Sequence, residues 1–171
     1  PNSLRKYPQP LGDTFRKAAG RVLNVDPDGI LIGNGSDDIL TILTRAFVPE
    51  GGLIAAPTPS YILYKSLAEI QGARFAAVPF RPGWEAPRLQ WPGGTHLNFF
   101  PNPNSPTGTI LSEYELELLA DDLAPAPLVI DEAYADFAAW NWLRPQFEHE
   151  PAPNVVVTRT MSKSYALAGI R

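Results

Sequence analysis

The chain has 171 residues, with 14 Lys and Arg against 18 Asp and Glu, a formal net charge of −4 and no cysteine. A chain of about this length buries roughly 70% of its extended surface on folding, which is enough for one domain with a full hydrophobic core. The absence of cysteine excludes disulfides and thiolate metal sites, and it agrees with the reducing cytoplasm. The mild negative charge gives no electrostatic basis for a nucleic-acid partner, and no apolar run approaches the roughly 18 residues of a membrane span.

Short apolar runs alternate with segments of helical periodicity along the chain. We expect strands at 30–32, 53–56, 74–78, 96–100, 128–130 and 155–157. We expect helices at 14–23, 36–47, 62–70 and 112–123. The apolar character of the strands is continuous, which indicates burial on both faces and a mostly parallel sheet between two layers of helices. The sequence therefore predicts an α/β fold, a single three-layer αβα domain.

Residues at the carboxyl ends of parallel strands carry the functional information, because ligands bind there. The turn Gly33-Asn34-Gly35-Ser36-Asp37-Asp38 leads from a strand into a helix and favours a phosphate through free N–H groups and the helix dipole. A plain capped turn is the alternative, since the third glycine of the dinucleotide fingerprint is absent. After the next strand, Tyr61 can stack on a planar ligand or be an ordinary core tyrosine.

Three further strand ends carry candidate side chains. The loop 101–108 offers the amides of Asn102 and Asn104, or is simply a rigid turn. Asp131 ends a strand that we expect to be buried, so its carboxylate needs a cation or several donors, and a structural salt bridge is the alternative. Lys163 follows the strand at 155–157, where its amine can lose a proton and attack a carbonyl, although most lysines are solvated charges. The two histidines have no partner at metal-ligand spacing.

Taken together and in this order, these segments resemble the cofactor site of the fold-type-I aminotransferases, most closely the histidinol-phosphate aminotransferase subgroup. The likeness rests on motifs at 4–8 (LRKYP), 33–38 (GNGSDD), 59–61 (PSY), 103–108 (PNSPTG), 131–134 (DEAY) and 160–171 (TMSKSYALAGIR). It covers essentially the whole chain and implies the large domain of an enzyme that depends on pyridoxal 5′-phosphate.

The resemblance implies a role for each matching residue near the ring of that cofactor. Lys163 would bond to the cofactor aldehyde and later move the proton between the substrate Cα and the cofactor C4′. Asp131 would pair with the protonated pyridine nitrogen, in agreement with the need of a buried carboxylate for a cation. Tyr134 would hydrogen-bond the phenolic oxygen, and Tyr61 would pack on the ring.

The resemblance also implies a phosphate site, formed by the backbone of Ser36 and Asp37 and by the side chains of Thr160, Ser162 and Arg171. Tyr7 matches a position that reaches the neighbouring subunit's cofactor phosphate, which implies a homodimer with a shared active site. The phenolic oxygen has a further amide contact in many relatives. Here the residue before Pro-Thr-Gly is Ser105, preceded by Asn104, so either of the two is a candidate for this contact.

The implied activity is transfer of an amino group between an amino acid or amine, such as histidinol phosphate, and a 2-oxo acid in histidine biosynthesis. A decarboxylase of the threonine-phosphate type shares the same motifs, and a non-catalytic phosphate-binding α/β domain is the alternative from a different class. The first residue is Pro1, so we expect a piece of a longer gene product.

In the family, the chain continues past Arg171 through an antiparallel strand beside 155–157 and into a small domain that holds the substrate carboxylate. We therefore expect residues 1–171 to be a partial large domain that is inactive alone and prone to associate through an unpaired strand edge.

Overall fold

The computed structural model describes residues 7, 9–143 and 152–169. The helices are α1 (Asp13–Leu23), α2 (Ser36–Phe47), α3 (Leu63–Gln71) and α4 (Glu113–Leu123), with single 3-10 turns η1 (Pro27–Gly29), η2 (Pro82–Trp84), η3 (Arg88–Gln90) and η4 (Ala135–Phe137). The strands are β1 (Leu53–Thr58), β2 (Arg74–Pro79), β3 (Leu97–Pro101), β4 (Leu128–Asp131) and β5 (Val155–Thr158). All strand pairs are parallel, in the order β2-β1-β3-β4-β5, which confirms the predicted class.

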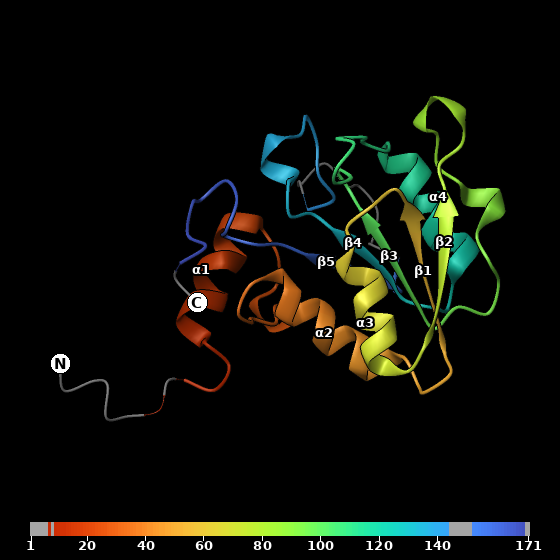
Figure 1. Ribbon diagram of the computed structural model, residues 1–171. Helices are drawn as coiled ribbons and strands as arrows, with labels where there is room; N and C mark the ends of the chain where they lie inside the picture. The colour runs from red at the N-terminus through yellow and green to blue at the C-terminus, as the bar shows by residue number, and fades with distance from the viewer. Residues whose placement is uncertain (1–6, 8, 144–151, 170–171) are drawn as a thin grey trace.

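Two apolar clusters lie on opposite faces of the sheet and give the three-layer arrangement (Figure 1). One cluster joins α2 and α3 to the sheet, and the other joins α4 to it. Successive residues of a strand point to opposite faces. Along β4, Val129 therefore packs in the cluster of α2 and α3, whereas Leu128 and Ile130 pack in the cluster of α4. The same alternation sends the next two residues, Asp131 and Glu132, to opposite sides.

Local signals in the sequence set two helix starts. Ser112 and Glu115 form the predicted capping box at α4, since the Ser112 Oγ accepts from the Glu115 N–H and the Glu115 carboxylate accepts from the Ser112 N–H. At α2, the chain turns through Gly35, whose φ of 86° suits glycine, and helical residues begin at Ser36. The Asp38 carboxylate accepts from the N–H of Asn34 at 2.9 Å and closes this turn.

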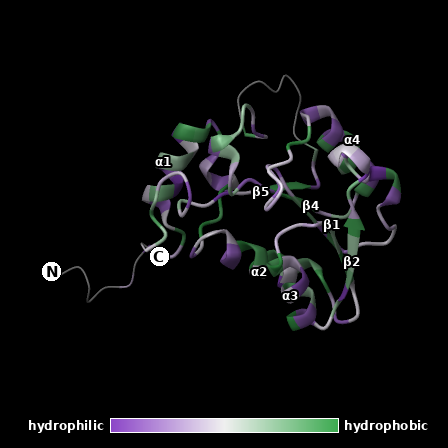
Figure 2. Cartoon of the chain, turned by 45° about the horizontal axis from the view of Figure 1, so that its top comes forward, coloured by the Kyte–Doolittle hydropathy of each residue, from purple (hydrophilic) through white to green (hydrophobic). Residues whose placement is uncertain are grey.

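The expected strand at 30–32 is wrong. Ile30 is extended, with φ −103° and ψ 122°, but the segment pairs with none of the described strands, and Leu31 is 58% exposed. A groove of about 1300 Å³, lined mainly by apolar residues, lies between this segment with α1 and the outer edge of β5. Figures 1 and 2 show α1 beyond the β5 side of the sheet, and Figure 2 shows that it carries hydrophobic residues. A strand forms only by pairing, and here the groove separates the segment from β5.

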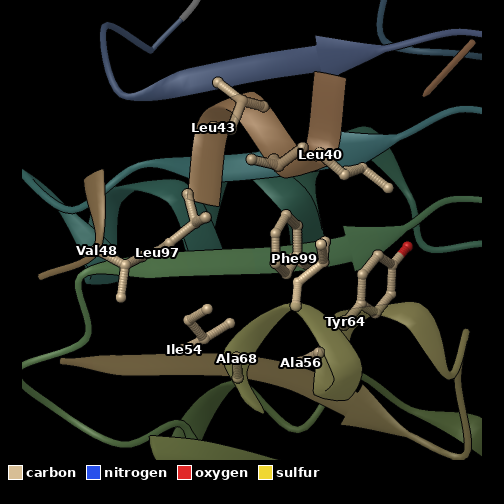
Figure 3. Close-up of a cluster of buried hydrophobic side chains, with 11 residues drawn as sticks. Leu40, Leu43, Val48, Ile54, Ala56, Tyr64, Ala68, Leu97 and Phe99 are labelled. Carbon is tan, nitrogen blue, oxygen red and sulfur yellow. The ribbon is translucent and has the colours of Figure 1, made fainter. Parts of the chain in front are cut away.

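The core beneath α2 and α3 places one polar group at the carboxyl end of the sheet. The Tyr64 ring is fully buried and stacks on Phe99, with ring centroids 4.7 Å apart. Figure 3 shows the Tyr64 hydroxyl pointing away from the other core side chains. A buried hydroxyl needs a hydrogen-bond partner, and its partner lies at the end of β4.

Candidate active site

A cavity lies at the carboxyl ends of the strands, between the start of α2 and the loops that follow β1, β3, β4 and β5. The chain leaves β1 for β2 toward one edge of the sheet and leaves β3 for β4 toward the other edge, so β1 and β3 flank the topological switch point at which such folds bind ligands. The predicted site residues that line the cavity are Ser36, Asp37, Tyr61, Asp131, Tyr134, Thr160, Ser162 and Lys163.

Asp131, the last residue of β4, is 4% exposed. Its Oδ2 accepts from the Tyr64 hydroxyl at 2.8 Å, and its Oδ1 accepts from the Ala133 N–H at 3.1 Å and the Thr158 hydroxyl at 3.3 Å. These donors are all neutral. Within the described part of the chain, no cation pairs with this carboxylate.

Burial raises the pKa of Asp131 above its ordinary value, and the hydrogen bonds from Tyr64, Ala133 and Thr158 oppose that shift. Burial also raises the pKa of Tyr64 well above its ordinary value, and the Asp131 charge adds to the shift. The Tyr64 hydroxyl is therefore a permanent proton donor to Asp131. The carboxylate is held in place by neutral groups and faces a cavity that a cationic group can enter.

Lys163 lines the cavity from the turn after β5. Its side chain is exposed at the rim of the cavity, and its Nζ lies 5.3 Å from the centre of the Tyr134 ring. The expectation of a lysine beside a buried strand is therefore modified, because β5 is the edge of the sheet and its three valines are only half-buried, although Thr158 is buried. The amine and the ring share the cavity with Asp131.

The start of α2 forms the third wall. The first turn of the helix, at Ser36 and Asp37, borders the cavity, and a helix N-terminus favours an anion. The hydroxyls of Thr160 and Ser162 line the same region and hydrogen-bond each other at 2.7 Å. Tyr61 is 37% exposed, and burial followed by the Asp37 charge raises its pKa.

The structure does not bring all the predicted residues into the cavity. The Asn104 amide donates to the carbonyl of Pro59 at 3.0 Å and to the Thr107 hydroxyl at 2.7 Å, so it holds two loops together, and Ser105 lines the cavity instead. Tyr7 is 99% exposed and is not among the lining residues. Arg171 lies outside the described residues.

Tyr64 is a site residue that the sequence reasoning missed. It lines the cavity and is the shortest hydrogen-bond donor to Asp131. The sequence signal that could have identified Tyr64 is its spacing from Tyr61. The two residues are three positions apart at the start of a helix and so share a face. The same spacing is equally typical of a stripe of core residues, and the Tyr64 ring does pack in the core.

The cavity combines three chemical preferences within a small space. Asp131 favours a cation, the start of α2 favours an anion, and Lys163 supplies an amine in the same cavity. A metal is not required by this set, and the described residues contain no cluster of His, Asp and Glu that could hold one. None of the described helices has the length and apolar character to cross a bilayer. The arrangement suits a planar ligand with a cationic ring atom, a phosphate and an electrophilic carbon.

Comparison with known proteins supports this description. The family model for aminotransferase class I and II matches residues 2–171. The histidinol-phosphate aminotransferase of Rhodopirellula baltica is 50% identical over 171 residues, covering 98% of this chain and 46% of the relative. Histidinol-phosphate aminotransferase 1 of Trichormus variabilis is 42% identical over 169 residues, covering 98% and 47%. The chain spans about half the length of these curated relatives.

Solved structures agree on the fold. Histidinol-phosphate aminotransferase from Sinorhizobium meliloti, in complex with pyridoxal 5′-phosphate, matches with a TM-score of 0.89 and 28% identity, over 99% of this chain and 48% of that one. L-threonine-O-3-phosphate decarboxylase from Porphyromonas gingivalis matches with a TM-score of 0.78 and 24% identity, over 99% and 53%, a level that indicates a shared fold alone. The resemblance noted in the sequence is thus confirmed, and the chain belongs to the aminotransferase class I and II family.

Proposed function

We propose that the protein containing this chain is a pyridoxal-phosphate-dependent aminotransferase. It transfers an amino group between histidinol phosphate, or a similar amino acid or amine, and a 2-oxo acid. The observation that carries the proposal is the cavity lined by both Asp131 and Lys163, in which no cation of the described residues pairs with the buried carboxylate. The family match and the relatives named histidinol-phosphate aminotransferase support the reaction and the substrate class.

The residues fit the cofactor by their charges. Among the described residues, the buried Asp131 carboxylate has neutral donors only, and a pyridinium nitrogen is a cation that such a carboxylate stabilises. The phosphate of the cofactor, away from its ring nitrogen, would find donors in the N–H groups of the first turn of α2 and in the hydroxyls of Thr160 and Ser162. Ser105 and Tyr134 line the remaining wall and offer hydroxyls to the phenolic oxygen.

Bound pyridoxal 5′-phosphate supplies a ring that withdraws electrons from the substrate Cα. The chain's own residues prepare that chemistry. Asp131 would keep the ring nitrogen protonated, Tyr61 would cover the ring, and the Lys163 amine, at the rim of the cavity, would move the proton between the substrate Cα and the cofactor C4′. Tyr134 lies under the amine and limits its positions.

Borohydride trapping tests the proposal directly. The complete gene product, incubated with pyridoxal 5′-phosphate, reduced and digested, should carry the pyridoxyl group on Lys163. The Lys163→Ala variant should carry none, whereas Lys65→Ala, which removes an exposed lysine paired with Glu69 on α3, should be labelled like the wild type. Label on a different lysine of the wild type contradicts the assignment.

Product analysis separates the proposed reaction from its alternatives. Transamination of histidinol phosphate requires a 2-oxo acid, whereas a decarboxylase releases carbon dioxide without one. A non-catalytic phosphate-binding domain would bind the cofactor equally well after Lys163→Ala and Asp131→Asn.

From the family resemblance we also propose a cytoplasmic homodimer in which Tyr7 reaches the neighbouring subunit's cofactor phosphate. Sedimentation of the gene product, with and without Tyr7→Ala, tests the dimer and the effect of Tyr7 on cofactor retention.

A further inference from the structure

A second carboxylate at the end of β4 lies in a network that the proposed reaction does not use. Glu132 has a fully buried side chain, and it points to the face opposite Asp131. Its Oε2 accepts from the Nε of Arg159 at 3.0 Å and from the Nη2 at 2.8 Å, and its Oε1 accepts from the N–H of Trp142. Two N–H groups of one guanidinium thus donate to a single carboxylate oxygen, and such charge-assisted hydrogen bonds are stronger than neutral ones.

The same guanidinium reaches a second carboxylate. Its Nη1 donates to the Oδ1 of Asp136 at 3.2 Å, and the Asp136 side chain is 35% exposed. The other oxygen of Asp136 accepts from the hydroxyl of Ser164. One arginine therefore connects the end of β4, the turn η4 and, through Asp136, the residue that follows Lys163.

These contacts hold two segments of the chain that border the cavity. Glu132 and Asp136 stand two residues before and two residues after Tyr134, so Arg159 holds the segment of Tyr134 from both sides. Ser164 holds the turn of Lys163 to the same Asp136. The two residues held in this way are those whose amine and ring approach to 5.3 Å.

We propose that Arg159, together with Glu132 and Asp136, is a positioning residue for Lys163. The network fixes the turn after β5 against the turn after β4, and it thereby sets where the Lys163 amine stands relative to Tyr134 and the cavity. The inference rests on the proposed function, because it concerns how the amine meets an aldehyde. None of the three residues lines the cavity beside Asp131, so they act through Lys163 and Tyr134 rather than on the ligand.

Two probes separate positioning of the amine from general damage to the site. Pyridoxal 5′-phosphate reports the rate at which Lys163 captures an aldehyde, followed by absorbance and borohydride trapping. Pyridoxamine 5′-phosphate has no aldehyde, so its affinity reports the rest of the cavity. Both are measured on the cofactor-free complete gene product, together with its thermal unfolding.

Arg159→Gln is the obvious variant, but it leaves the buried Glu132 without its cation and can unfold the protein. Asp136→Asn is therefore the deciding variant, since Asp136 is partly exposed and the change keeps its shape. Asp136→Glu restores the charge. Arg88→Gln is the matched control, because Arg88 pairs with Asp122 of α4 and is absent from the cavity lining.

We expect Asp136→Asn to slow capture by about tenfold, the scale of a misplaced reacting group, while the affinity for pyridoxamine 5′-phosphate changes by less than about twofold. Asp136→Glu should recover most of the rate, and Arg88→Gln should match the wild type. Capture at the wild-type rate by Asp136→Asn, or equal slowing by Arg88→Gln, would overturn the inference and leave the proposed function intact. A wild-type protein that captures no aldehyde on Lys163 contradicts both.

Discussion

Two neighbouring carboxylates at the end of β4 have opposite surroundings. Asp131 and Glu132 are both buried, and burial raises the pKa of each. Glu132 pairs with the Arg159 guanidinium, which opposes the rise in its pKa, whereas Asp131 has only neutral donors within the described residues. The alternation of a strand separates them onto two faces, one directed at the core of α4 and one at the cavity.

The difference indicates which carboxylate is structural and which is reserved for a ligand. A buried carboxylate that pairs with a cation of the same chain needs no ligand to neutralise its charge. A buried charge held by a hydroxyl, an amide and a second hydroxyl is oriented but not neutralised, and it favours a cation that arrives with a ligand. Four predictions test this contrast.

The largest expected effect is on stability, from breaking the completed pair. Arg159→Met should destabilise the protein by about 3–5 kcal/mol, because it leaves Glu132 buried and unpaired. Adding Glu132→Leu should recover a large part of this loss, as an apolar pair can replace a buried ion pair. Urea unfolding of the complete gene product measures both variants. A loss below about 1 kcal/mol for Arg159→Met would mean that the pair is not the structural one.

The next effect is on catalysis, from Asp131, the carboxylate that no cation of the described residues neutralises. Asp131→Asn preserves size and removes charge, so the barrier to proton removal at the substrate Cα should rise by about 3 kcal/mol or more, roughly a hundredfold in rate. Steady-state transamination of histidinol phosphate measures the change. Glu132→Gln serves as the comparison and should have a smaller effect on the rate per folded molecule. Unchanged turnover in Asp131→Asn would make Asp131 a structural residue.

A smaller effect should follow from removing the shortest donor to Asp131. Tyr64→Phe should lower stability by about 1.5–3 kcal/mol, the usual contribution of one hydrogen bond to a charged group. It should also raise the pKa of Asp131 further, since the Tyr64 hydroxyl lowers it. Tyr61→Phe is the matched control, because its hydroxyl lies 3.4 Å from the exposed Asp37 and should contribute little. Equal losses in the two variants would contradict this account of Tyr64.

The smallest effect is a pH-dependent gain in stability. The folded pKa of Asp131 lies above its ordinary value of 3.8, so its charged form disfavours the folded state once the pH exceeds that value. Asp131→Asn should therefore stabilise the cofactor-free protein by about 1 kcal/mol at pH 7, a typical gain at a functional site. The gain should shrink as the pH falls, and it should vanish below the ordinary pKa, where the carboxyl is protonated in both the folded and the unfolded protein. Unfolding midpoints between pH 4 and pH 7 would show the opposite trend if a cation already paired with Asp131.

The sequence predicted most of the fold because apolar runs and helix caps are local signals. The five strands of the sheet were expected near their observed positions, and Ser112 with Glu115 caps α4 as the pattern indicated. The segment 30–32 was misjudged because a strand depends on a neighbour, and its apolar residues line a groove beside β5 instead. Pairing is a nonlocal property that no short window of sequence contains.

The sequence predicted those site residues whose chemical type, once buried, requires a particular kind of partner. Asp131 at a strand end required donors or a cation, and the structure provides donors. Tyr64 was missed because its ring packs in the core while its hydroxyl serves the site. The contrast between Asn104, which ties two loops together, and Ser105, which lines the cavity, depends on loop geometry.

The central claim, that Asp131 is the carboxylate reserved for a cationic ligand atom, can be tested by one measurement. The complete gene product is loaded with pyridoxal 5′-phosphate labelled with ¹⁵N in the ring, and the ¹⁵N chemical shift reports whether that nitrogen carries a proton. The account predicts a protonated nitrogen in the wild type near pH 7 and loss of that proton in Asp131→Asn. A nitrogen that is unprotonated in the wild type, or equally protonated in both proteins, would contradict it.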